Sequence, residues 1–107
     1  MADLALIARI PSVASAVLGD LAGGFYDAIR EGDGESVASV AAFVSSALAG
    51  AGEELGLGAL HRVGIAGEKR ALAVVVLGDS VVIARIEPAA SLAAVERALD
   101  AAVGTGG

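Results

Sequence analysis

The most constraining feature of this sequence is the stretch from residue 36 to residue 52, SVASVAAFVSSALAGAG, which contains no charged side chain. Valine and leucine recur in it at steps of three and four residues, so the pattern predicts a helix over 35–55. A helix on the surface of a globular domain normally has a polar face opposite its apolar stripe. Because this helix lacks charge on every side, we expect it to be buried on both faces.

The two sides of the predicted helix differ in the size of their side chains. We expect the side with the larger residues to pack on the chain's own sheet; it consists of Val37, Val40, Val44 and Leu48. The opposite side carries small residues that let another backbone approach closely, namely Ala38, Ser39, Ala42, Ser45, Ser46 and Ala49. The commonest way to cover such a side is a twofold dimer in which the helix meets its own copy.

Two other interpretations of the helix stay open. In one it is a surface helix that simply lacks charge, and in the other it crosses a membrane. A membrane span needs about 20 apolar residues. This stretch is shorter, contains four serines and two glycines, and is flanked by acidic residues. Stable membrane insertion is therefore the interpretation that we favour least.

Glycines and prolines divide the rest of the chain into short elements. Apolar spacing predicts a short helix over 3–10, ended by Pro11, and a final helix over 92–103, capped by Ser91. Asp33 is placed to cap the long helix. Runs rich in valine, isoleucine and alanine predict strands over 12–18, 25–30, 60–66, 71–77 and 81–87.

The links between the predicted strands are short and contain glycine, which favours antiparallel hairpins. The predicted order is αββαβββα, an α+β fold with a five-stranded antiparallel sheet and helices packed on it. We expect one domain over residues 1–103 and a flexible tail over 104–107.

Composition excludes several classes of protein. There are 13 acidic and 7 basic residues and no basic cluster, so the chain lacks the electrostatic footprint of a nucleic-acid-binding protein. Cysteine is absent, which excludes disulfides and thiolate chemistry. The N-terminal segment carries acid and is interrupted by Arg9 and Pro11, unlike a signal peptide. We therefore expect a cytoplasmic protein.

The predicted strand over 60–66 adds a second surface for self-association. His61, Val63 and Ile65 share one of its faces. An exposed strand edge of this kind invites pairing with another chain. We expect a dimer interface that combines this edge with residues from both sides of the long helix, and it contains Val37, Val40, Ala41, Val44, Ser45, Leu48, His61 and Val63.

The sequence offers little for catalysis. His61 is the only histidine, and as a general base it would need a nucleophile and an orienting acid near it. The run from Gly32 to Glu35 lacks the lysine and hydroxyl of a phosphate loop and the oxygens of a calcium loop, so a turn and a helix cap explain it. We expect no catalytic residues, no metal and no cofactor.

The second half of the chain, EELGLGALHRVGIAGEKRALAVVVLGDSVVIARIEPAASLAAVERAL, resembles the roadblock (dynein light-chain) family, in particular its small bacterial MglB-like members. The match lies in a helix ending in EELGLG, strands joined by GE and GD turns, and a final helix opening with Ser-Leu. The resemblance implies a homodimer with a continuous sheet and paired central helices. It also implies a role in regulating or scaffolding a small Ras-like GTPase, often in bacterial polarity or motility, and some members accelerate GTP hydrolysis.

We therefore expect a non-enzymatic homodimeric module that binds a small GTPase. Arg62 and Arg85 are the candidate contacts to an acidic partner. Three alternatives stay open: a generic dimerisation or adaptor domain, a small-molecule sensor, and an enzyme that uses His61. A sensor pocket normally has aromatic walls, and Phe25, Tyr26 and Phe43 are the only aromatic residues.

Overall fold

The computed structural model describes residues 4–20, 22–56, 61–78 and 80–102. Within them the element order predicted from the sequence is confirmed. Predictions that fall on Asp3, Leu60, Asp79, Val103 and the tail over 104–107 lie outside these residues. The elements are α1 (Leu4–Ala8), β1 (Val13–Asp20), β2 (Phe25–Ile29), α2 (Gly34–Glu54), β3 (Arg62–Ala66), β4 (Ala71–Leu77), β5 (Ser80–Ile86), the 3-10 turn η1 (Ala89–Ser91) and α3 (Leu92–Ala102).

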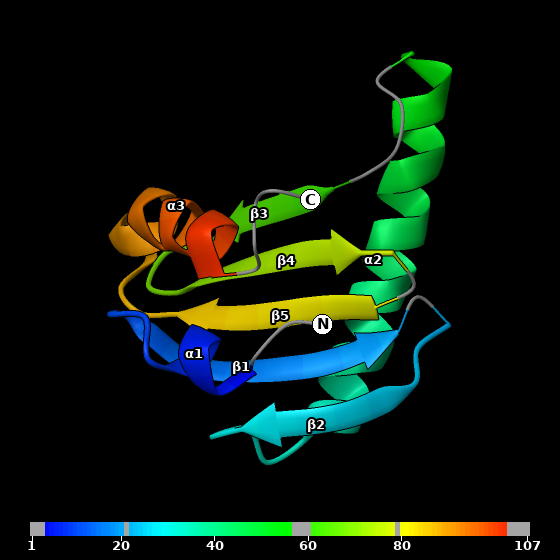
Figure 1. Cartoon of the computed structure of the whole chain (residues 1–107). Helices are drawn as coiled ribbons and strands as arrows, with labels where there is room; N and C mark the ends of the chain where they lie inside the picture. The colour runs from blue at the N-terminus through cyan, green and yellow to red at the C-terminus, as the bar shows by residue number, and fades with distance from the viewer. Residues whose placement is uncertain (1–3, 21, 57–60, 79, 103–107) are drawn as a thin grey trace.

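The five strands form one antiparallel sheet in the order β2-β1-β5-β4-β3 (Figure 1). The inner strands are rich in valine, isoleucine and alanine and are largely buried on both faces, which is why they are nearly continuous apolar runs in the sequence. The edge strands β2 and β3 are shorter and more exposed. β2 carries the exposed Asp27, and its pairing with β1 is interrupted by a register shift at Leu18 and Gly19.

Helices cover the two faces of the sheet unequally (Figure 1). α1 and α3 lie on one face, where Ile7 and Leu99 are fully buried with Ile86 of β5. α2 lies on the other face, and its main contacts are with β1, β2 and β5. α2 crosses this face close to the end where β4 finishes and β5 begins, so the opposite end of the same face lacks a helix (Figure 1).

The start of α2 fits closely against the strands. The Asp33 carboxylate accepts a hydrogen bond of 3.3 Å from the backbone N–H of Ser36, which confirms the predicted helix cap. A Cβ atom on Gly19 would lie 2.6 Å from the carbonyl oxygen of Gly24 and 3.0 Å from the Cβ of Ala38. Only glycine therefore permits this approach between β1, its turn and α2.

The turn between β1 and β2 is organised by Asp20. Its Oδ1 accepts hydrogen bonds from the backbone N–H groups of Ala22, at 2.9 Å, and Gly24, at 2.8 Å. Its Oδ2 accepts one of 2.8 Å from the hydroxyl of Tyr26. Led by the Tyr26 bond, these hydrogen bonds lower the pKa of Asp20 because they stabilise the ionised carboxylate.

The predicted cap of the last helix is wrong. Ser91 lies in η1, which follows the cis peptide bond between Glu87 and Pro88. Its Oγ accepts a hydrogen bond of 3.2 Å from the Oγ of Ser12. The short 3-10 turn leads directly into α3, so Ser91 connects η1 to the loop before β1 where we expected a helix cap.

The predicted orientation of α2 is also wrong. Val40 is 59% exposed and Leu48 is 42% exposed, whereas Ala38, Ala42 and Ser45 are buried. The sheet beneath the helix already supplies large side chains, among them Val17, Val74 and Ile83. Small residues on the helix let it approach this surface at normal packing density, whereas larger ones would overfill the space.

Among the described helices, α2 alone is long and apolar enough to cross a membrane, judged by length and composition. A core helix of a soluble protein passes the same test. Here the N-terminal half of α2 packs on the sheet through Ala38, Ala41 and Ser45. The long helix is therefore only partly covered by the rest of the domain.

Candidate interaction surface

The larger apolar residues of α2 form a stripe beside and above the part that packs on the sheet. The stripe consists of Val37, Val40, Val44, Leu48 and Leu55, which are half-buried or exposed. Their spacing of three, four and seven residues places them on one side of the helix. Phe43, 76% exposed, borders the stripe on the outer side. A monomer leaves this apolar surface in water, which is typical of a binding face.

The uncovered end of the sheet lies beside this stripe. A groove of 470 Å³ lies between Val37 and Val40 of α2 and Leu72 of β4, with Glu31 and Arg85 among its polar residues. A neighbouring cavity of 390 Å³ is lined by Ile65, Leu72, Arg70 and Arg85. The stripe and the two hollows together form a continuous surface, which we call the open face.

The outer edge of β3 borders the open face. Among the described strands, β3 pairs with β4 alone, and the carbonyl oxygen of His61 accepts a hydrogen bond of 2.8 Å from the N–H of Val76. Backbone groups alternate in direction along an antiparallel strand, so those of Arg62, Gly64 and Ala66 are directed away from β4. This edge can accept a further strand.

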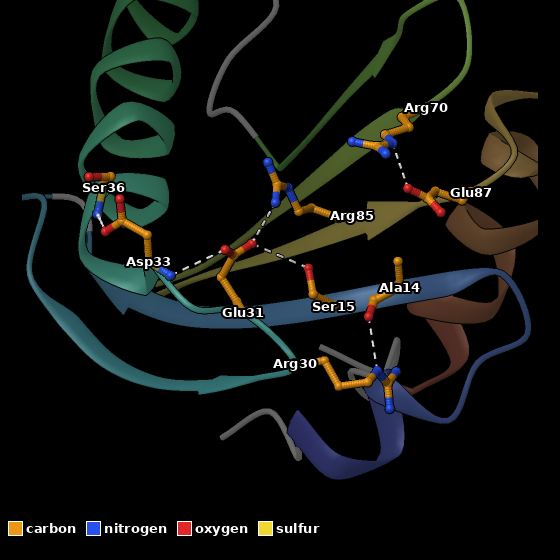
Figure 2. A network of polar contacts seen from close by, with 9 residues as sticks. All are labelled: Ala14, Ser15, Arg30, Glu31, Asp33, Ser36, Arg70, Arg85 and Glu87. Carbon is orange, nitrogen blue, oxygen red and sulfur yellow. Dashed lines mark hydrogen bonds and ion pairs between the residues drawn. The ribbon is translucent and has the colours of Figure 1, made fainter.

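A buried carboxylate holds the polar end of the open face together (Figure 2). The side chain of Glu31 is only 9% exposed. Its Oε1 lies 2.9 Å from Nη1 of Arg85 and accepts a hydrogen bond of 3.4 Å from the hydroxyl of Ser15, and its Oε2 accepts one of 3.3 Å from the N–H of Asp33. Glu31 thereby ties the start of α2 to the sheet and fixes one nitrogen of Arg85.

Arg30 holds the segment just before Glu31. It adopts a left-handed backbone conformation with a φ of 59°, unusual for a residue with a side chain. Its guanidinium donates hydrogen bonds to the carbonyl oxygens of Ala8, Val13 and Ala14, at 2.7, 3.1 and 2.9 Å (Figure 2 shows the last). These contacts join the ends of α1 and β2 to β1 and orient the chain for the turn into α2.

Solved structures of other proteins share this architecture. MglB of Myxococcus xanthus aligns with a TM-score of 0.80 at 20% identity, covering 91% of this chain and 82% of that chain. The gliding protein MglB of Thermus thermophilus gives 0.76 at 16% identity, covering 95% and 83%. A Roadblock/LC7 domain from Streptomyces avermitilis gives 0.71 at 19% identity, covering 89% and 88%. The chain has a roadblock-type, MglB-like fold.

The fold expected from the resemblance is therefore confirmed. No protein-family model matches the chain, and no curated protein matches it by sequence. The fold is recognised through the order and geometry of its elements, because at 16–20% identity few individual residues are shared with these structures.

In this roadblock-type domain, Arg62 lies on the face opposite α2 and contacts α3 of its own chain. Its Nε lies 3.4 Å from Oε2 of Glu96, and its Nη1 pairs with the carboxylate of Asp100. The hydrogen bond to Asp100 raises the pKa of Arg62. These pairs hold α3 against β3. Arg85, the other expected partner contact, lines both hollows of the open face, and its side chain is 53% exposed.

The residues expected at a dimer interface fall into two groups. Ala41 and Ser45 are buried against the domain's own sheet, each 2% exposed. The others lie on the open face or next to the edge of β3. They are Val37, Val40, Val44, Leu48, His61 and Val63.

Several residues of the open face escaped the sequence analysis. Phe43 and Leu55 lie on the helix that was singled out, and a helical projection that included its last turn would have found them. Ile65, Arg70 and Leu72 come from two strands and their turn. Their meeting depends on tertiary structure.

His61 is exposed just before β3, and its backbone carbonyl accepts the hydrogen bond from the N–H of Val76. Within residues 4–20, 22–56, 61–78 and 80–102, no group of three or more histidine, cysteine or acidic residues is arranged to hold a metal ion. The features of this domain point to macromolecular contact through the open face.

Proposed function

We propose that this chain is a non-enzymatic, homodimeric roadblock-type module that binds a small Ras-like GTPase in the cytoplasm and regulates or scaffolds it. The observation that carries the proposal is the open face, a continuous apolar surface that a monomer leaves in water. The roadblock resemblance supports the GTPase as partner. The solved MglB structures support the fold on which that resemblance rests.

The homodimer follows from where the open face lies. A twofold axis perpendicular to the sheet and beside β3 would pair that strand with its own copy. The same axis would bring two stripes of α2 together over the extended sheet. Exposed apolar residues that such a dimer would cover include Val40, Leu48, Leu55 and Ile65. Their burial supplies the hydrophobic gain that association requires.

The proposal is tested in two stages with purified protein. Sedimentation equilibrium at micromolar concentration comes first, and we expect a mass of twice 10.4 kDa. A stable monomer would overturn the homodimer. Small GTPases from the same genome are then mixed with the chain, loaded either with GDP or with a non-hydrolysable GTP analogue.

We expect co-elution with one GTPase in one nucleotide state. Comparing the GTP hydrolysis rate with and without the chain then separates an activator, which speeds hydrolysis, from a scaffold, which leaves the rate unchanged. A dimer that binds no such GTPase in either state would contradict the regulatory half and favour a generic adaptor domain.

A further inference from the structure

The C-terminal end of α2 projects away from the sheet of its own subunit. Ser45 is the last fully buried residue of the helix, and the final turns extend past the edge of β3 (Figure 1). The nine residues from Ser46 to Glu54 span about 13 Å at 1.5 Å per residue. The end consists of Glu53, Glu54 and Leu55, all of them exposed. We call these three residues the arm.

The cavity on the open face has the opposite charge. Arg30, Arg70 and Arg85 line the cavity of 390 Å³ together with a single acidic residue, Glu87, so three of the 7 basic residues of a chain with net charge −6 gather there. Arg70 is 77% exposed and pairs with the exposed Glu87, and Arg85 uses one nitrogen for Glu31. Leu72 supplies an apolar floor to both hollows.

The arm and this cavity lie at opposite ends of the strands. α2 crosses the sheet near the end of β4, whereas the cavity lies at its start, around Ala71 (Figure 1). A twofold axis perpendicular to the sheet beside β3 exchanges the two ends, so the arm of one copy arrives over the cavity of the other. Neighbouring strands are about 4.8 Å apart. The helical segment of about 13 Å that carries the arm therefore crosses β3 and β4 of the second copy, and the long side chains of Glu53 and Glu54 extend from its end toward β5, which carries Arg85.

We propose that the arm is exchanged between subunits: Glu53 and Glu54 of one copy pair with Arg70 and Arg85 of the second copy, while Leu55 packs on its Leu72. The inference rests on the proposed homodimer and deepens it, because it names the charges that fix partner and register. Opposite charges brought together at an interface set specificity and orientation.

The test uses two charge-reversed variants of the full chain. Variant A carries Glu53→Lys and Glu54→Lys, and variant B carries Arg70→Glu. Arg85 is left intact because Glu31 depends on it. In a homodimer of A, the reversed arm faces Arg70 and Arg85, and in a homodimer of B the native arm faces an acidic side chain at position 70 while its attraction to Arg85 remains. When A and B are mixed, one arm of the heterodimer regains an opposite charge at position 70 and the other keeps its native pairing. Arg97→Glu, at an exposed position of α3 and with the same change in charge as variant B, is the matched control for that variant.

We expect A and B each to dimerise at least about tenfold more weakly than the native chain at low salt, a loss that salt reduces. An equimolar mixture should form the A–B heterodimer in clear excess, measured by native mass spectrometry, and Arg97→Glu should dimerise normally. Native-strength homodimers of A and B, with statistical mixing, would overturn the exchange while leaving the homodimer intact. A native chain that is monomeric would instead remove the proposed function and the exchange with it.

Discussion

Glu31 and Arg85 meet at 2.9 Å although 54 positions separate them in the chain. Glu31 follows β2 and lies shortly before the start of α2, while Arg85 lies on β5. The pair therefore connects the segment that leads into α2 with the sheet (Figure 2). The two ends differ in environment: Glu31 is nearly buried and Arg85 is half-exposed. The carboxylate is therefore the partner whose loss is costly.

Replacing Glu31 with alanine should lower the free energy of unfolding by about 1–3 kcal/mol, because Ser15 and the N–H of Asp33 lose their acceptor and Arg85 loses its charge partner. Urea unfolding followed by circular dichroism measures the change. Glu68→Ala, at an exposed position in the turn between β3 and β4, is the control and should change stability by less than about 0.5 kcal/mol. Equal effects of the two substitutions would show that the network is unimportant.

Charges placed on α2 should separate folding from association. Val40→Glu and Leu48→Glu lie at exposed positions and should give folded monomers, since the new carboxylate remains in water until a partner covers it. Ala42→Glu, at a site only 5% exposed, should unfold the chain instead. Sedimentation velocity and thermal unfolding together distinguish these results. Dimers of native affinity in both exposed-site variants would show that the stripe is not the interface.

A pair of glycines tests the contact between β1 and α2. Gly19→Ala should lower the free energy of unfolding by about 1–3 kcal/mol, because its Cβ would collide with the backbone of Gly24. Gly50→Ala, in α2 with nothing within 4 Å of the added Cβ, should raise it by about 0.5–1 kcal/mol through higher helix propensity. Chemical denaturation of both variants checks the opposite signs.

The turn held by Asp20 should make stability depend on acid pH. The pKa of Asp20 is lowered in the folded state, so its contribution is complete above the unfolded value of about 3.9 and disappears as the pH falls through the lower folded value. Asp20→Asn should remove this part of the dependence. We would measure unfolding free energies from about pH 5 down to about pH 2. An unchanged profile for Asp20→Asn would refute the assignment.

The sequence predicts the element order well because its signals are local. Glycine turns and the cap at Asp33 mark where strands and the long helix begin, and valine-rich runs identify the inner strands. The prediction of which side of α2 faces the sheet was wrong, because packing depends on the side-chain volumes of both the helix and the sheet. Ser45 illustrates the difficulty: it is buried, and its hydroxyl has no hydrogen-bond partner among the described residues. No pattern of hydrophobicity would place it inward.

The candidate surface was predictable only where it depends on local sequence signals. The stripe from Val37 to Leu48 is a local repeat, so it was found, although its direction was misjudged. The cavity beside it joins Arg70 and Leu72 of one hairpin to Arg85 of the next strand. Neighbours of this kind follow from the order of strands in the sheet, which short-range signals leave undetermined.

For the proposed homodimer, the contrast between the two edge strands predicts that assembly stops at two subunits. β3 offers a regular free edge, whereas β2 is disturbed by the register shift at Gly19 and carries the exposed Asp27. Charge and irregularity on an edge discourage further strand pairing. A subunit with one receptive edge behaves like a monofunctional reagent in polymer chemistry: it couples once and leaves no end from which a chain of subunits can extend.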